Sequence, residues 1–197
     1  MPTNNPNTPK RTIIALTNPK SSSNVGGTMR AAGCYDAHKV VYSGERFNRA
    51  VRLAADTQKV HEIVPLQHYE DLLEALEPGM KLVCIDLIEG ATPLPNFEHP
   101  NNAMYLFGPE DGTIKQQVIN QADAVVYIPT IGCMNLAASV NVVLYDKLAK
   151  SKQHTLDNEL IKQSRDKNNK IKVKALKYEK NMIKAAKKRE RLTKEND

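Results

Sequence analysis

Residues 103–112 have the sequence AMYLFGPEDG, in which five apolar residues run directly into a glycine, a proline and two acidic residues. A short apolar run bounded by turn-forming residues is typical of a strand buried inside a sheet. We therefore predict a buried strand at 103–107 that opens into a polar loop at its carboxyl end.

Similar segments flank this strand on both sides. Apolar or β-branched runs predict strands at 11–16, 39–42, 81–88 and 124–128, with a short extended piece at 63–65. Helical spacing predicts helices at 25–32 (with Asn24 as N-cap), 48–57, 69–76, 114–120 and 135–148, and a loop at 96–102. Strands that alternate with helices predict an α/β fold, with a mostly parallel sheet and helices on both faces.

Polar and glycine-rich sequences follow four of the predicted strands. They begin after residues 16, 88, 107 and 128. In parallel α/β sheets, ligands bind beyond the carboxyl ends of the strands. The sequence therefore predicts a ligand site at that edge of the sheet.

Positive charge is concentrated at the C-terminal end of the chain. The whole sequence has 28 Lys and Arg against 22 Asp and Glu, whereas residues 147–197 alone hold 17 against 7. Basic blocks of this kind often bind polyanions, although a solvated and partly disordered tail is the simpler alternative. We expect a flexible segment at 1–10, one domain at 11–150, and a basic tail at 151–197 that is helical or partly disordered.

The cysteine and apolar content points to a cytoplasmic protein. Cys34, Cys84 and Cys133 are widely spaced, with no histidine or cysteine cluster at zinc spacing, so we expect reduced thiols and no metal. Residues 1–10 are polar and proline-rich, without the apolar core of a signal peptide. No apolar run approaches the length of a membrane span, so we expect no membrane partner.

Three motifs occur in a fixed order, each at the end of a predicted strand. They are NP at 18–19 with NVGGTMR at 24–30, then LFGPEDG at 106–112, and then IP at 128–129 with GCMNL at 132–136. Their types, order and spacing resemble the signature motifs of the SpoU branch of the SPOUT RNA methyltransferases, over about residues 12–148.

The resemblance implies more than the periodicity does. It implies a deep trefoil knot in the C-terminal part of the domain, whose loops hold S-adenosylmethionine. It also implies a homodimer, with each site completed across the interface, and an RNA partner, tRNA or rRNA. The implied activity is methylation of a ribose 2′-hydroxyl, with base methylation as an alternative.

The same resemblance assigns four candidate catalytic residues. Arg30 matches the arginine that activates the ribose hydroxyl or steers its phosphate, and an arginine does this as a bidentate donor because its planar guanidinium stays protonated. Glu110 would organise the site by pairing with that arginine or with the knot loop. Asn24 would position Arg30 or the substrate, and Asn135 would orient the substrate while capping the last helix.

Five further residues match positions that contact the cofactor. Gly108 would expose backbone groups to the adenosine, and Cys133 stands where serine is common. Ile85, Ile128 and Met134 would contribute backbone and apolar contacts.

The sequence departs from the usual motifs in two places, and both departures bear on the substrate preference. Residues 21–23 (SSS) are extra in the first loop, and the third motif is shorter than usual between Pro129 and Asn135. The alternative function is a non-catalytic RNA-binding or ribosome-assembly protein that uses a methyltransferase fold. Retention of Arg30, Glu110 and Asn135 favours the enzyme.

Overall fold

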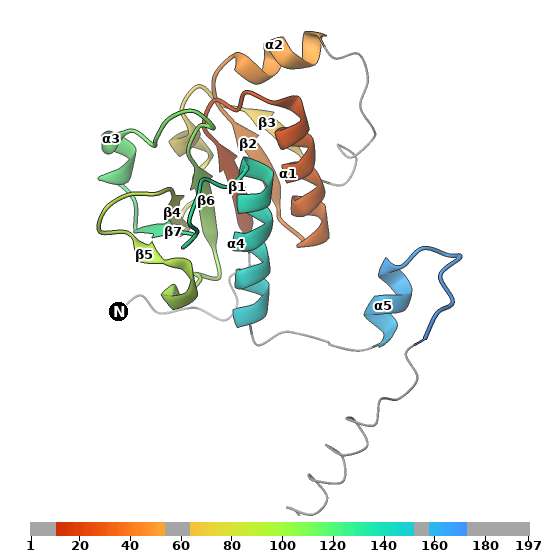
Figure 1. Ribbon diagram of the computed structural model, residues 1–197. Helices are drawn as coiled ribbons and strands as arrows, with labels where there is room; N and C mark the ends of the chain where they lie inside the picture. The colour runs from red at the N-terminus through yellow and green to blue at the C-terminus, as the bar shows by residue number, and fades with distance from the viewer. Residues whose placement is uncertain (1–10, 54–63, 152–157, 173–197) are drawn as a thin grey trace, which may run out of the picture. The chain divides into compact units, whose positions relative to one another are not determined.

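The computed structural model describes residues 11–53, 64–151 and 158–172 (Figure 1). The chain divides into two compact units, residues 1–154 and 155–197. The predicted flexible segment at 1–10 lies outside the described residues, as does most of the predicted basic tail.

A single parallel sheet forms the centre of the first unit (Figure 1). Its strands are β1 (Thr12–Leu16), β2 (Lys39–Tyr42), β3 (Leu66–His68), β4 (Lys81–Ile85), β5 (Thr92–Pro93), β6 (Ala103–Phe107) and β7 (Ala124–Tyr127). Their order across the sheet is β3-β2-β1-β6-β4-β7-β5, and every adjacent pair is parallel. The predicted α/β class is therefore confirmed. Strand order alone does not establish the predicted knot, which stays a prediction.

Strand β6, with which the sequence analysis began, lies between β1 and β4. Ala103 pairs with Thr12 on one side and Lys81 on the other, and Phe107 pairs with Leu16 and Ile85. All five β6 residues are buried. This explains why the segment is apolar throughout: both faces and both edges of the strand are covered.

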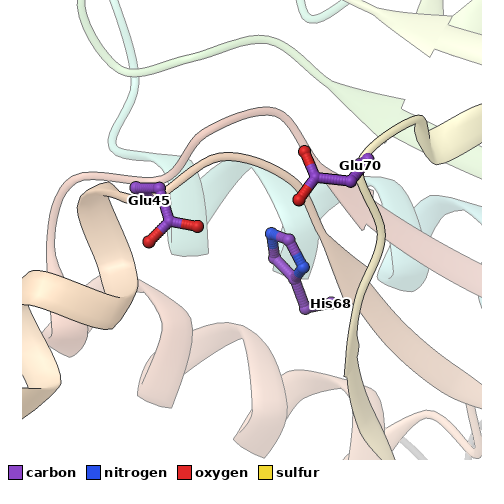
Figure 2. A group of neighbouring side chains, drawn as sticks. All are labelled: Glu45, His68 and Glu70. Carbon is purple, nitrogen blue, oxygen red and sulfur yellow. The ribbon is translucent and has the colours of Figure 1, made fainter.

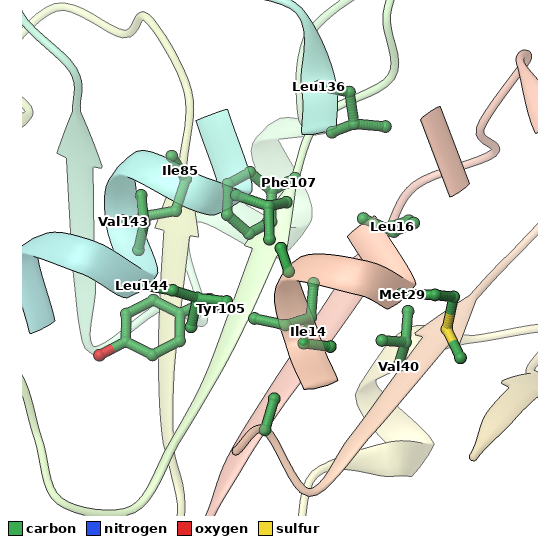
Figure 3. Close-up of a cluster of buried hydrophobic side chains, with 14 of the residues drawn as sticks. Ile14, Leu16, Met29, Val40, Ile85, Tyr105, Phe107, Leu136, Val143 and Leu144 are labelled. Atoms are coloured by element: carbon green, nitrogen blue, oxygen red, sulfur yellow. The ribbon is translucent and has the colours of Figure 1, made fainter. Parts of the chain in front are cut away.

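Helices cover both faces of the sheet. The elements are α1 (Ser22–Cys34), α2 (Arg46–Leu53), α3 (Gln116–Ile119) and α4 (Leu136–Lys150), with the 3-10 turns η2 (Leu72–Ala75) and η3 (Leu94–Asn96). One apolar cluster joins α1 and α4 to alternate strand residues such as Ile14 and Tyr105 (Figure 3). A second cluster joins η2 and the residues around α3 to the opposite strand residues, such as Ile13 and Met104.

Several predicted elements differ from the observed ones. The helix predicted at 69–76 is wrong, because only η2 forms there; Asp71 caps it and Leu76 is already extended. The extended piece predicted at 63–65 begins outside the described residues, and the third strand begins at Leu66. Strand β4 ends three residues earlier than predicted. Strand β5 and the turn η3 were not predicted. The helix predicted at 48–57 begins at Arg46, and its last predicted residues lie outside the described part of the chain.

A buried polar network ties the loop after η3 to the end of α4. The His99 ring lies 2.7 Å from the Tyr105 hydroxyl through Nδ1 and 2.8 Å from Asp146 through Nε2. Lys150 completes the network with an ion pair to Asp146 at 2.7 Å. The His99 side chain is only 4% exposed, so burial lowers its pKa although the Asp146 hydrogen bond opposes that shift.

The second unit contains one described helix, α5 (Asn158–Ser164). Its residues are exposed, and Lys162 pairs with Glu159 one turn away. Of the helices that the structure describes, none has the length and apolar character needed to cross a membrane.

Candidate active site

The three motifs follow the carboxyl ends of three strands in a group of four adjacent strands. Strands β1, β6, β4 and β7 end at Leu16, Phe107, Ile85 and Tyr127, and they are neighbours in the sheet. The first motif continues from β1 into α1, the second follows β6, and the third runs from β7 into α4. Parallel pairing therefore brings segments far apart in the sequence to one edge, as predicted.

A cavity of about 370 Å³ opens at this edge. That volume lies within the range of small-molecule sites. It is lined by Asn24, Ile85, Asp86, Leu87, Phe107, Gly108, Pro109, Glu110, Gly112, Ile128, Thr130, Cys133, Met134, Asn135, Leu136 and Ser139. All five residues predicted to contact the cofactor are in this set, as are three of the four predicted catalytic residues.

Three of the predicted catalytic residues form one chain of hydrogen bonds. The Asn24 amide donates to Oε1 of Glu110 at 2.6 Å. The Asn135 amide donates to Oδ1 of Asn24 at 2.7 Å. The chain joins all three motifs, and it fixes the orientation of the Asn24 amide because donor and acceptor partners are both defined.

Glu110 also receives hydrogen bonds from the backbone of the first loop. The amides of Lys20 and Ser21 donate to its carboxylate, at 2.5 and 3.3 Å. A carboxylate that accepts several N–H groups is held in one position. Glu110 thus organises the loop before α1, rather than pairing with Arg30.

Asn135 is the N-cap of α4, as predicted. Its Oδ1 accepts from the backbone amides of Ala137 at 2.9 Å and Ala138 at 3.3 Å. Both acceptor positions of the oxygen are occupied, so a ligand can meet only the remaining N–H of the side-chain amide.

The prediction that Asn24 caps the first helix is wrong. The N-cap of α1 is Ser21, whose hydroxyl accepts from the Asn24 backbone amide, so Asn24 lies inside the first turn. The extra serines of this loop supply that earlier cap. The Asn24 side chain is thereby free to bond Glu110 and Asn135.

Arg30 is the one predicted catalytic residue that does not line the cavity. It is exposed on α1, and within the described residues it makes no hydrogen bond or ion pair. The face of α1 that carries Val25 and Met29 packs on the sheet. In a single copy of the chain, the guanidinium is therefore separate from the Glu110, Asn24 and Asn135 chain.

Asp86 lines the cavity and was not predicted. It follows β4 directly, and its carboxylate accepts from the amides of Ile114 and Leu87, each at 2.8 Å. A Cβ atom on Gly108 would lie 2.8 Å from its Oδ2. The sequence pattern that could have identified Asp86 is a single carboxylate directly after the apolar run at 81–85. It was missed because the strand was predicted to continue to residue 88.

A second carboxylate fixes the loop that carries Glu110. Asp111 accepts two hydrogen bonds from the Arg46 guanidinium, at 2.7 and 2.8 Å. This contact lowers the pKa of Asp111 from its ordinary value. The first turn of α2 thereby holds residues 108–112 in place through a bidentate ion pair.

The fold and the site together define a class of protein, and a comparison of the sequence with known families identifies that class. Residues 11–145 match the model of the SpoU rRNA methylase family, and the chain belongs to that family. No curated protein matches the sequence significantly.

Solved structures with the same fold are similar over most of the domain. One is the SpoU methyltransferase AviRb from Streptomyces viridochromogenes, 19% identical with a TM-score of 0.59, covering 73% of this chain and 61% of that one. Another is an AdoMet-bound rRNA methyltransferase from Sinorhizobium meliloti, 20% identical with a TM-score of 0.60, covering 72% and 57%.

A third similar structure concerns 2-OH methylation of C/U34 on tRNA. It is 21% identical with a TM-score of 0.61, covering 72% of this chain and 91% of that one. At these identities the likeness shows the fold. The chain spans less than two thirds of the first two structures and most of the third.

Proposed function

We propose that this protein is an S-adenosylmethionine-dependent RNA methyltransferase that modifies a ribose 2′-hydroxyl in tRNA or rRNA. The observation that carries the proposal is the hydrogen-bonded chain Glu110–Asn24–Asn135 on the wall of a cavity that also contains the five predicted cofactor contacts. Family membership and the AdoMet-bound structure of a similar rRNA methyltransferase support the cofactor.

The chemistry of the cavity suits this cofactor. Ile85, Ile128 and Leu136 offer apolar surface for an adenine ring, and the carboxylates of Asp86 and Glu110 favour the positive sulfonium group. Gly108 lets the backbone of the second motif approach closely. When bound, the cofactor supplies an activated methyl group, so the protein needs no covalent nucleophile, and Cys133 serves as a contact residue.

The residues of this chain would then orient the substrate oxygen. The free N–H of the Asn135 side chain would donate to the ribose 2′-oxygen, while Glu110 and Asn24 keep that amide in position. Alignment of reacting groups can contribute several kcal/mol, with about 7–11 kcal/mol as the upper range.

Arg30 would act from a second copy of the chain. Its exposed position outside the cavity is the placement expected of a residue that completes the site of a homodimer partner. As a permanent cation it would bind the adjacent phosphate and stabilise negative charge on the 2′-oxygen, rather than accept its proton.

The test is methyl transfer from labelled S-adenosylmethionine to unmodified tRNA and rRNA, followed by identification of 2′-O-methyl nucleosides by mass spectrometry. We expect Arg30→Ala to lose activity while it still binds S-adenosylhomocysteine. Arg49→Ala, which changes another exposed arginine on the same domain, is the matched control.

Two outcomes would contradict the proposal. RNA binding without transfer to any RNA would support the assembly-protein alternative. Methylated bases with unmodified riboses would retain the enzyme and reject the 2′-hydroxyl as its target.

A further inference from the structure

Three potential metal ligands meet at the carboxyl ends of β2 and β3, among residues that do not line the cavity. Glu45 lies in the loop between β2 and α2, His68 is the last residue of β3, and Glu70 lies just beyond it. The pairing of Tyr42 with His68 sets this arrangement, because it places both strand ends at the same level.

The three side chains surround a gap. Their ligand atoms all lie within 4.8 Å of one another. Figure 2 shows the two carboxylates on either side of the imidazole ring. Within the part of the chain that the structure describes, no hydrogen bond or ion pair joins them. The spacing is thus too wide for direct bonding, but it is close to that of ligands around an ion.

A second observation concerns the His68 ring itself. The residue is partly exposed, but its Nε2 atom is buried and has no hydrogen-bond partner among the described residues. The ring packs edge-on against Tyr42, with centroids 5.1 Å apart, so its position is fixed by an aromatic contact. Buried polar atoms almost always have a partner, and an orphan often marks a missing ion or water.

The loop that follows β1 also contains a buried polar atom without a hydrogen-bond partner among the described residues. This atom is Oδ1 of Asn18, and Asn18 packs directly against Gly44, the residue before Glu45. Asn18 and Gly44 both have positive φ angles, 42° and 75°. Glycine and asparagine adopt such angles more readily than other residues do. The strand ends beside the triad thus hold two unpaired polar atoms.

We propose that Glu45, His68 and Glu70 bind a divalent transition-metal ion of the zinc type. Imidazole favours such ions over magnesium or calcium, which prefer all-oxygen sites. Three protein ligands leave a fourth position for water. Bonds of about 2.0–2.2 Å require the ligand atoms to move inward by less than about 1 Å, which rotation of the two glutamate side chains allows.

The charge balance of the site fits this ion. Two carboxylates repel each other across the gap, and a dication would neutralise both while giving Nε2 of His68 a partner. The bound ion would link the loop before α2 to the loop after β3. This proposal is independent of the methyltransferase proposal, since it involves no residue of the cavity.

The test is calorimetric titration of the full-length, chelator-treated protein with Zn²⁺, repeated with Co²⁺ while the visible spectrum is recorded. Cys34 and Cys133 are exposed, so both are replaced by serine in every sample to remove competing thiolates. We expect one saturable site. With Co²⁺, we expect visible absorption bands typical of an ion bound by nitrogen and oxygen ligands. Mg²⁺ in place of Zn²⁺ should show no saturable binding.

His68→Gln should weaken Zn²⁺ binding more than about tenfold, because even an outer-shell partner of a metal ligand contributes that much. His38→Gln removes an exposed histidine elsewhere and should leave the affinity unchanged. If His68→Gln fails to fold by circular dichroism, Glu70→Gln, at an exposed position, replaces it. Absence of saturable binding to the unsubstituted triad, or unchanged affinity in the His68 and Glu70 variants, would overturn the proposal.

Discussion

Gly27 of α1 faces Ala137 of α4 so closely that a Cβ atom on the glycine would lie 2.8 Å from the Cβ of the alanine. Real Cβ atoms do not approach so closely, so the two helices pack at this distance only because position 27 has no side chain. Asn24 lies in the first turn of α1 and Asn135 is the N-cap of α4, and the two side chains bond each other. The contact between Gly27 and Ala137 therefore sets the spacing on which that hydrogen bond depends.

Substitution of Gly27 and Gly26 by alanine should have opposite effects on stability. Gly27→Ala overpacks the contact between α1 and α4 and should destabilise the fold by about 1–3 kcal/mol. At Gly26 no atom lies within 4 Å of the new Cβ, so Gly26→Ala should stabilise the helix by about 0.5–1 kcal/mol. Urea unfolding measures both, and equal signs would contradict the packing.

Asn24→Asp should weaken the site, because it removes the N–H donated to Glu110 and places a second carboxylate beside it. We expect a loss of about 1 kcal/mol in stability and a larger proportional loss of methyl transfer. Asn141→Asp is the control, since Asn141 also donates one side-chain hydrogen bond, on the exposed face of α4. Equal activity in the two variants would remove Asn24 from the site.

Gly108→Ala should impair cofactor binding. The new Cβ would lie 2.8 Å from Oδ2 of Asp86 and 3.4 Å from the Ile114 side chain, so the Asp86 carboxylate must move. We expect at least about tenfold weaker binding of S-adenosylhomocysteine in calorimetry, which corresponds to about 1.4 kcal/mol. Gly132→Ala, where no atom lies within 4 Å of the new Cβ, should bind normally.

The free energy of unfolding should decrease as the pH falls through the range in which His99 becomes protonated. The pKa of His99 is lowered from its ordinary value of 6.5 by burial, so the unfolded chain binds its proton more readily than the folded protein does. The contribution of neutral His99 is therefore complete above about pH 6.5 and is lost as the pH falls toward the folded-state pKa. Urea midpoints from pH 5 to 8 should show this slope.

The slope should shrink in His99→Gln and persist in His38→Gln, which changes an exposed histidine. Equal slopes in the two variants would assign the pH dependence to other groups.

Removal of residues 151–197 should weaken RNA binding and reduce its salt dependence. The tail is basic overall, and the slope of log K against log salt falls by about 0.7–0.9 for every phosphate that the protein no longer neutralises. Fluorescence anisotropy with a labelled RNA over a range of KCl concentrations measures that slope. An unchanged slope would show that the methyltransferase domain alone binds the phosphates.

The elements that could be predicted from sequence are those determined locally. The run at 103–107 is buried on both faces, so its composition alone identifies a strand, and β6 has those bounds. The helix predicted at 69–76 failed because Leu72 and Ala75, apolar at helical spacing, are buried by a single 3-10 turn. Periodicity cannot separate one turn from two.

The candidate site was predictable only where a motif named its residues. Glu110, Asn24 and Asn135 could be identified as neighbours by resemblance, whereas their order of hydrogen bonds required the structure. The ion pair of Arg46 with Asp111 has no sequence signal, because it depends on how the loop after β2 meets the loop after β6. The grouping of Glu45 with His68 depends in the same way on the pairing of β2 with β3.

The position of β6 also constrains how the chain can be synthesised and folded. A ribosome delivers β1 to β4 before β6 exists, yet β1 and β4 have no direct pairing and meet only through β6. Until residue 107 has emerged, β1 and β4 each have an edge that lacks its native partner, β6. We expect late, cooperative closure of the sheet, with nascent chains shorter than this most prone to aggregation.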